Sequence, residues 1–191
     1  MIIPKEIYHY SSKPVKLEDL EIINYIAVNN KRPFSFKPAG LWISIEDYKD
    51  EDDVTWDSWC IKENFRIDSL KVKNKIILHE KANILLLTTF KDIYSFGKEN
   101  RFDIESYLKT TLGGNYEESD DVIFDLDSET TKEILQISWD KVIKKYDGIF
   151  IAPYNWEARW HTETIWYYGW DCASGCIWNI DIIKEIKEES T

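Results

Sequence analysis

Two short stretches near the start of the chain combine residue types that can bind a small molecule. In the first, IYHYSS (7–12), a histidine is followed by a tyrosine and two serines. In the second, KPAGLWISI (37–45), a glycine precedes a leucine, a tryptophan and a serine. Imidazole can donate and accept hydrogen bonds, and an indole ring stacks on planar groups. The two stretches are therefore either two walls of one small-molecule site or simply two core strands.

The pattern of apolar residues predicts the elements that position these stretches. Strands are expected at 5–11 and 41–45, because apolar and aromatic residues dominate both segments. Between them, spaced apolar residues predict a helix over 17–30, and two prolines predict a loop over 32–40. Each stretch is thus expected to lie on a strand, with a helix and a loop between the two.

The remainder of the chain alternates strands with few helices, which favours an α+β fold with mainly antiparallel pairing. A helix over 129–146 is expected from apolar residues stepping by 4, 3 and 4 positions. The segment 112–121 is expected to be a loop because of its paired glycines and acidic residues. The other expected elements are a helix over 53–64, strands within 65–89, strands at 147–154 and 175–183, and a short charged C-terminal helix.

Length and charge set limits on the class of protein. A chain of 191 residues is expected to form a single domain, 1–191, with a sizeable core. Its formal net charge of −11 argues against general binding of nucleic acid, which usually needs a basic surface. We expect no membrane span, since no apolar run approaches ~20 residues, and no secretory leader, since Pro4 and charged residues directly follow the first three residues. Three cysteines do not suggest a disulfide framework, so a cytoplasmic location is expected.

Aromatic residues are abundant, with nine Trp, eleven Tyr and eight Phe. Most are expected to fill the core, because bulky rings dominate protein interiors. The alternative is that several line a groove, which would make the chain an aromatic-lined carbohydrate or peptide binder. The tryptophans considered for such stacking platforms are Trp56, Trp59, Trp156, Trp160 and Trp170.

Common catalytic and nucleotide-binding motifs are missing from the sequence. Neither GxGxxG nor GxxxxGK[ST] occurs, so neither dinucleotide fingerprint nor P-loop is available. HExxH and GxSxG are also absent. Cys172 and Cys176 have a spacing seen in metal sites, but nearby ligands that would complete a set are lacking, and no metal is expected.

Taken together, the two opening stretches resemble the ADP-ribosyltransferase superfamily, which includes the poly-ADP-ribose polymerases and the diphtheria-toxin class. A histidine on the first strand, hydroxyl residues after it, and a later glycine–aliphatic–aromatic–x–serine strand carry this resemblance. The resemblance implies a split, mainly antiparallel β-sheet core with peripheral helices. It also implies that NAD, as substrate, lies between the two strands.

The resemblance assigns roles to particular residues. His9 would bind the ribose on the nicotinamide side, and Ser11 would offer a further hydroxyl. The main-chain amide of Tyr10 would bind the carboxamide, and Trp42 would stack on nicotinamide. The remaining residues assigned to the NAD site are Gly40, Leu41 and Ser44.

The family's third signature residue, a glutamate, aligns with Ser174 in SGCIWN (174–179). A serine cannot supply the carboxylate that stabilises positive charge on the ribose. Asp171 or Glu163 is expected to supply it instead. The leading hypothesis is an enzyme that transfers ADP-ribose from NAD to an unknown acceptor. The alternative is a module that binds NAD or ADP-ribose without catalysis.

Overall fold

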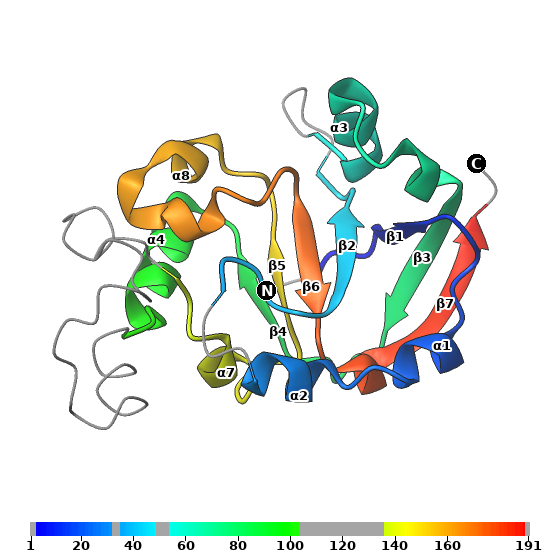
Figure 1. Ribbon diagram of the computed structural model, residues 1–191, viewed down its shortest axis with the longest axis horizontal. Coiled ribbons are helices and arrows are strands. Elements are labelled where there is room, and N and C mark those ends of the chain that lie inside the picture. Colours follow the sequence, from blue (N-terminus) through cyan, green and yellow to red (C-terminus); the bar gives the residue numbers. More distant parts are fainter. Residues whose placement is uncertain (1–2, 32–34, 49–53, 104–135, 190–191) are drawn as a thin grey trace, which may run out of the picture.

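The protein is described by a computed structural model over residues 3–31, 35–48, 54–103 and 136–189. Seven strands form one sheet in the order β4-β5-β6-β2-β1-β3-β7 (Figure 1). Five of the six neighbouring pairs are antiparallel, whereas β4 and β5 are parallel. The predicted α+β class is confirmed, and the sheet is mixed. The strands are β1 (Ile7–Ser11), β2 (Leu41–Ile45), β3 (Val72–Leu78), β4 (Ile84–Leu87), β5 (Gly148–Ile151), β6 (Ser174–Ile177) and β7 (Ile183–Glu189).

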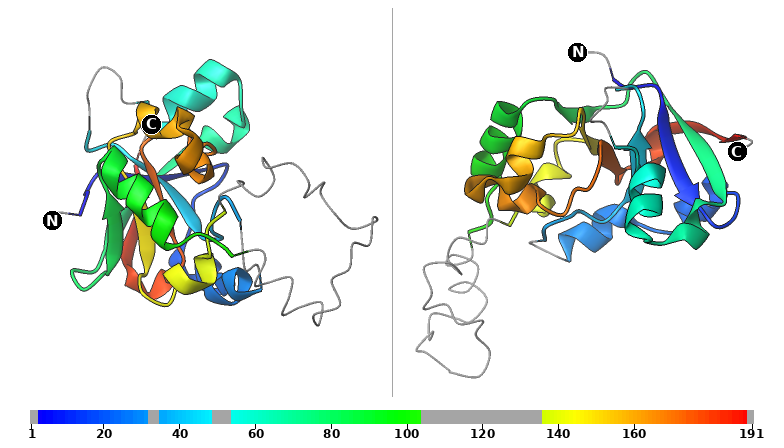
Figure 2. Two further views of the ribbon diagram at one scale, coloured as in Figure 1. Left: turned by 90° about the vertical axis from the view of Figure 1, so that its left-hand side faces the viewer. Right: turned by 90° about the horizontal axis from the view of Figure 1, so that it is seen from above.

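Short helices surround this sheet in three groups. In Figure 1, α4 and α8 lie together near β4 and β5, α3 lies beyond the end of β2, and α7, α2 and α1 lie in a row below the strand ends; Figure 2 gives two further views. The α-helices are α1 (Leu17–Glu21), α2 (Tyr25–Asn30), α3 (Trp56–Glu63), α4 (Phe90–Glu99), α7 (Trp139–Val142) and α8 (Trp156–Trp160), and the 3-10 helices are η1 (Ile67–Leu70), η2 (Thr162–Tyr167) and η3 (Ile180–Ile182).

The sheet is divided at β1, which changes its pairing partner part way along. It pairs with β2 only at Ile7 and Tyr8, and with β3 from Tyr8 to Ser11. In Figure 1, β1 turns away from β2 and runs toward β3. Beyond Tyr8 the second half of β1 is thus not paired with the first half of β2, and this unpaired stretch between the two strands is called the gap.

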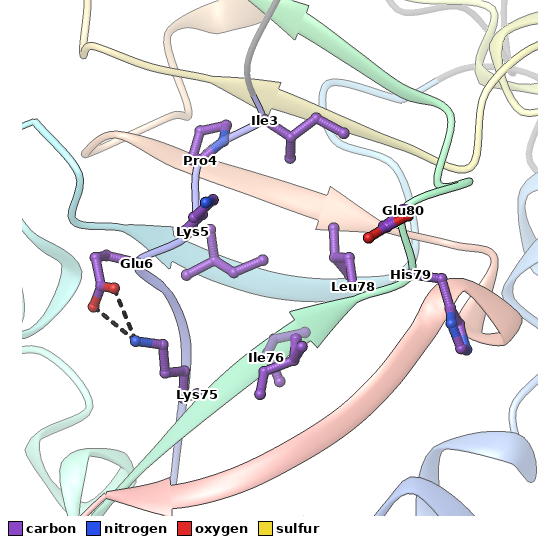
Figure 3. A pocket seen from close by; sticks show the side chains of 11 residues that line it. Ile3, Pro4, Lys5, Glu6, Lys75, Ile76, Leu78, His79 and Glu80 are labelled. Atoms are coloured by element: carbon purple, nitrogen blue, oxygen red, sulfur yellow. Dashed lines mark hydrogen bonds and ion pairs between the residues drawn. The ribbon is translucent and has the colours of Figure 1, made fainter.

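A cavity of about 600 Å³ lies where the chain before β1 has not yet joined β3. Figure 3 shows the side chains of Ile76 and Leu78 along β3 in this cavity. At its rim the Lys75 ammonium lies 2.8 Å from a Glu6 carboxylate oxygen. The cavity is therefore a second consequence of the change of partner, at the opposite end of β1 from the first gap.

Of the 24 aromatic residues that the structure describes, ten are buried and five more are partly buried against the core, so the prediction of a largely aromatic core is borne out only in part. Four of the nine tryptophans, Trp139, Trp166, Trp170 and Trp178, are fully buried. Trp139 and Trp178 donate indole hydrogen bonds to the main-chain oxygens of Ser35 and Tyr146. These bonds satisfy the polar edge of each ring, which burial would otherwise leave without water.

The single helix expected over 17–30 is instead two short helices, α1 and α2. The break falls at Ile22–Asn24, and the Asn24 side chain accepts a hydrogen bond from the Ala27 amide at 2.8 Å. Asparagine is a favoured N-cap because its short side chain satisfies a free amide of the first turn. The spacing of apolar residues continues across Asn24, so it predicted one helix and did not reveal this cap.

Of two further helix predictions, one holds only over α7 within the described residues and the other is wrong. Residues 129–135 of the helix expected over 129–146 lie outside the described part of the chain, as does the loop expected at 112–121. Ile137 is extended and bridges Ser35 and Arg101, so α7 begins only at Trp139. The expected C-terminal helix is the strand β7, which pairs with β3. Its charged residues are accommodated because β7 is an edge strand with exposed side chains.

Residues 67–70, expected in a strand, form the 3-10 helix η1, and β3 starts at Val72. The residue before η1, Arg66, has a left-handed backbone with φ 48°. This conformation is incompatible with an extended strand, so the segment turns before β3 begins.

Asp147 joins three strands, so its removal should destabilise the sheet. Its carboxylate accepts hydrogen bonds from the Asn83 amide at 2.9 Å and from the Asn179 side chain at 2.7 Å. We expect Asp147→Ala to lower the free energy of unfolding by about 1.5–3 kcal/mol, as for hydrogen bonds to charged groups. Urea unfolding measures this change. The control Asp68→Ala, at an exposed surface pair, should leave the midpoint unchanged.

Candidate functional site

His9 lies at the place where β1 and β2 stop pairing. Its Nδ1 is 2.8 Å from the main-chain oxygen of Trp42, and the side chain is half-buried. A carbonyl oxygen only accepts hydrogen bonds, so Nδ1 carries the proton and donates it. In the neutral ring Nε2 is then an acceptor. No residue of the described chain forms a hydrogen bond with Nε2.

This hydrogen bond replaces a rung of the β1–β2 ladder. The Glu46 amide donates to the Glu6 oxygen at 2.7 Å, which fixes the alternation of bonded pairs along the two strands. If that alternation continued, Trp42 would pair with Tyr10. Instead the Trp42 oxygen bonds the imidazole, and the register ends at Tyr8 and Ser44. The main chain of Tyr10 is thereby left facing the gap.

Burial lowers the pKa of His9 below its ordinary value of 6.5, and the hydrogen bond to the Trp42 oxygen offsets part of this change. A charged imidazolium loses hydration when it is buried, which favours the neutral form. At neutral pH the ring is therefore neutral, with its donor committed to Trp42 and its acceptor available.

The Trp42 indole belongs to a cluster next to the gap. It meets the Trp170 ring edge-on at 4.9 Å between centroids, and the Lys37 ammonium lies 4.9 Å from its centroid. Because Tyr8 and Ser44 are opposite each other, side-chain alternation puts Trp42 on their face and His9 on the other. The two residues are joined through the Trp42 main chain, and their rings do not share one face.

Asp171 lies in the same cluster as Trp42. Its Oδ1 accepts from Arg159 Nη1 at 3.2 Å, and its Oδ2 is 4.0 Å from Lys37 Nζ. The same Nη1 donates to the Tyr154 hydroxyl at 2.6 Å and to the Trp170 oxygen at 3.0 Å. This network holds the carboxylate beside the Lys37 ammonium that covers Trp42.

Lys37 links the ring to the carboxylate and is itself partly buried. Burial lowers the pKa of its ammonium, and the neighbouring Asp171 carboxylate offsets part of the effect. The ammonium contacts an aromatic face and one carboxylate oxygen, so it is placed to meet any group that approaches Trp42.

Glu163 lies elsewhere. It is exposed on η2, and its main-chain amide donates to Nδ1 of His161 at 3.2 Å. Its carboxylate contributes to raising the pKa of Lys98, after the larger effect of the Tyr94 hydroxyl. Within the described ranges, none of its interactions reaches Trp42 or Asp171. Of the two predicted carboxylates, Asp171 is the one that the structure brings to the cluster.

Several other predicted site residues have structural partners. The Ser44 hydroxyl accepts from the Trp56 amide at 3.2 Å and so fixes the start of α3. Leu41 is buried in the core. The Tyr10 hydroxyl donates to Glu46 at 2.8 Å, and burial raises its pKa well above the ordinary range. These side chains are therefore engaged in the fold, and ligand contacts at Tyr10 would have to use its main chain.

Gly40 allows β2 to approach β6 closely. A Cβ there would lie 2.4 Å from the Cys176 sulfur and 2.6 Å from the Ile177 oxygen. On β6, Ser174 is buried opposite Ser44, and its hydroxyl donates to the Cys172 oxygen at 2.9 Å. Neither residue presents a free polar group to the Trp42 cluster.

The cysteines are free and buried. Burial raises the pKa of Cys172 to about 12, so its thiol carries no charge at neutral pH. Among the residues that the structure describes, no group of three His, Cys, Asp or Glu side chains is arranged to hold a metal ion.

Three residues of the site were not predicted from the sequence: Lys37, Arg159 and Asn74. Asn74 interrupts an otherwise strand-like segment, and asparagine is depleted in strands. Lys37 follows Phe36 in the sequence and Arg159 precedes Trp160, so each is a cation next to an aromatic residue in an acidic chain. That composition is a weak signal, because it does not indicate that Lys37 and Arg159 both reach Asp171.

Comparisons with protein-family models, with curated proteins and with solved structures find no match. Across the helices of the described ranges, none combines the length and the apolar character needed to cross a bilayer.

Gly40→Ala tests the close approach of β2 to β6. The added methyl would meet main-chain atoms of Ile177, which cannot move aside without distorting the sheet. We expect a loss of about 1–3 kcal/mol in unfolding free energy, as for overpacked cores. Thermal unfolding followed by circular dichroism measures it. Gly169→Ala is the control, since its added methyl would meet only the flexible end of Lys37.

The lowered pKa of His9 predicts how stability changes with pH. Between its ordinary value of 6.5 and the lower folded value, the unfolded chain binds more protons, so stability falls as pH falls. The contribution of His9 should be complete above pH 6.5 and decrease below it, by at most about 1.4 kcal/mol per pH unit. Urea unfolding at several pH values should show a shallower slope for His9→Asn. Equal slopes would contradict the assignment.

Proposed function

We propose that this protein binds NAD at the gap between β1 and β2 and transfers ADP-ribose from it to an acceptor yet to be identified. One observation carries the proposal: a neutral imidazole is fixed at the gap by the Trp42 oxygen, with its second nitrogen left as an acceptor. That geometry suits a hydroxyl of a ribose, which can donate to Nε2.

The main chain of Tyr10 supports the same placement, because the ladder alternation directs its polar groups toward β2 beyond the end of the pairing. An amide N–H and a carbonyl oxygen that face a gap can pair with a planar carboxamide, as a neighbouring strand would. Because His9 and Trp42 project from opposite faces, a ligand that contacts both has to lie across the gap. The nicotinamide ribose would then meet His9, and the nicotinamide ring would lie toward Trp42.

The transfer step breaks the bond between the ribose C1′ and the nicotinamide nitrogen. Nicotinamide leaves with the electron pair, positive charge develops on the ribose, and the acceptor's nucleophile attacks C1′ and loses its proton. A fixed carboxylate stabilises such charge. Asp171 is assigned this role because it lies beside the Lys37 ammonium over Trp42.

The second candidate is binding of NAD or ADP-ribose without catalysis. It is favoured by Ser174, which is buried and bonded to its own chain where the family's glutamate would lie. Both candidates predict that NAD raises the melting temperature by mass action. Only the first predicts release of nicotinamide.

Substitutions of His9 test the NAD site. His9→Asn keeps a donor for the Trp42 oxygen but has no acceptor at the position of Nε2. We therefore expect a folded protein with at least about tenfold weaker NAD affinity, as for loss of one hydrogen bond to a buried polar group. Isothermal calorimetry with NAD and chromatographic measurement of nicotinamide give the two readouts. Wild-type NAD affinity and turnover in His9→Asn would sink the site assignment.

Asp171 and Glu163 offer a matched pair for the carboxylate. Asp171→Asn should lower nicotinamide release about 100-fold or more while NAD binding persists, since its charge is needed only as the bond breaks. Glu163→Gln, at an exposed position, should leave release unchanged. If release survives in Asp171→Asn and disappears in Glu163→Gln, the roles are reversed. Binding without release in the wild type supports the second candidate.

A further inference from the structure

Asn74 is a buried polar residue directly opposite His9 on β3. Its side chain is 1% exposed, and the register pairs the two residues across the strands. Buried amides are retained only where their donors and acceptors are satisfied, because each unpaired group loses its hydration on burial. The partners of this side chain therefore show what it holds in place.

The Asn74 amide binds three points of the chain that follows Tyr8. Its Nδ2 donates to the His9 oxygen at 3.0 Å and to the Ser11 hydroxyl at 2.9 Å. Its Oδ1 accepts from the Val15 amide at 3.2 Å. One side chain thus binds residues 9, 11 and 15, over the stretch where β1 has already left β2.

These contacts matter because β2 no longer supports this part of β1. Beyond Tyr8, β1 is paired only with β3, while the imidazole still reaches back to the Trp42 oxygen. The direction of the His9 side chain depends on its main chain, and the main-chain oxygen of His9 is bonded by Asn74. Asn74, on the β3 side, thus binds the main chain of His9, whereas Trp42, on the β2 side, binds its imidazole.

We propose that Asn74 is a positioning residue: by holding the main chain of His9, it keeps the imidazole as the Nδ1–H tautomer directed at Trp42, with Nε2 left for the ligand. The functional meaning of this role rests on the proposed NAD site. The role itself is a property of the ligand-free protein, so it can be tested without NAD.

The test uses long-range ¹⁵N–¹H spectra of the histidine rings, which distinguish Nδ1–H from Nε2–H. The His9 signals are identified by their loss in His9→Asn. We expect the Nδ1–H form in the wild type and a substantial Nε2–H population in Asn74→Ala and Asn74→Asp. Ala removes the amide, and Asp keeps its shape but cannot donate to the His9 oxygen. Both should weaken NAD binding about tenfold.

A control separates positioning from simple loss of stability. Asn179→Ala removes hydrogen bonds to Asp147 and from Asp181, away from β1, and should leave the His9 tautomer unchanged. Should neither Asn74 variant fold, Ser11→Ala removes one partner of the amide at a half-buried position and should give a smaller shift.

Wild-type His9 signals in folded Asn74→Ala and Asn74→Asp would overturn the positioning role, as would unchanged signals in Ser11→Ala if those variants do not fold. A tautomer shift in a protein that does not bind NAD in its wild-type form would support positioning and overturn the proposed function instead.

Discussion

The Trp42 main-chain oxygen accepts a hydrogen bond from the His9 imidazole where the alternation of the β1–β2 ladder calls for the Tyr10 amide. A side-chain donor in that position satisfies the oxygen without bringing the two strands together. Strand β1 is then free to turn toward β3, and the sheet divides into two parts that share β1. The gap at His9 and the cavity beside Ile76 both follow from this change of partner.

A gap within a sheet persists only if the chain on both sides is fixed by other interactions. On the β1 side this is done by Asn74, which binds the His9 oxygen. On the β2 side it is done by Asn29, which is 2% exposed and exchanges two hydrogen bonds with Ala39, each at 2.8 Å. Gly40 allows β2 to lie close to β6, because a Cβ at this position would collide with Cys176 and Ile177. Two buried asparagines and one glycine thus hold apart strands that would otherwise be able to continue pairing.

The sequence predicted the central strands β1 and β2 better than it predicted the elements around them. Strands β1 and β2 were predicted because apolar and aromatic residues follow the period of a strand there. Helix α4 was not predicted, although Thr89 and Asp92 form a capping box at its start. The strand β7 looks helical in sequence because Ile183 and Ile186 are three residues apart, but in the structure it pairs along β3 as a strand.

The residues of the candidate site were likewise predicted only in part. His9 and Trp42 were placed together by a resemblance in residue types and in their order along the chain, and the structure joins them by a hydrogen bond to the Trp42 main chain. The change of partner at Tyr8 could not be inferred, since it depends on which donor reaches the Trp42 oxygen. The same holds for Arg159 and Lys37, which come to Asp171 from segments 12 and 134 residues away along the sequence, a separation that no local pattern encodes.

Lys37 connects the aromatic ring and the carboxylate of the cluster. Its ammonium lies over Trp42 and 4.0 Å from Asp171 Oδ2, while Oδ1 is bonded by Arg159. Any ring that stacks on this face of Trp42 has to displace the ammonium. Once displaced, Lys37 no longer screens Oδ2, whereas Arg159 still holds the carboxylate in place. The Lys37 side chain therefore links the position of the Trp42 ring to that of the Asp171 carboxylate.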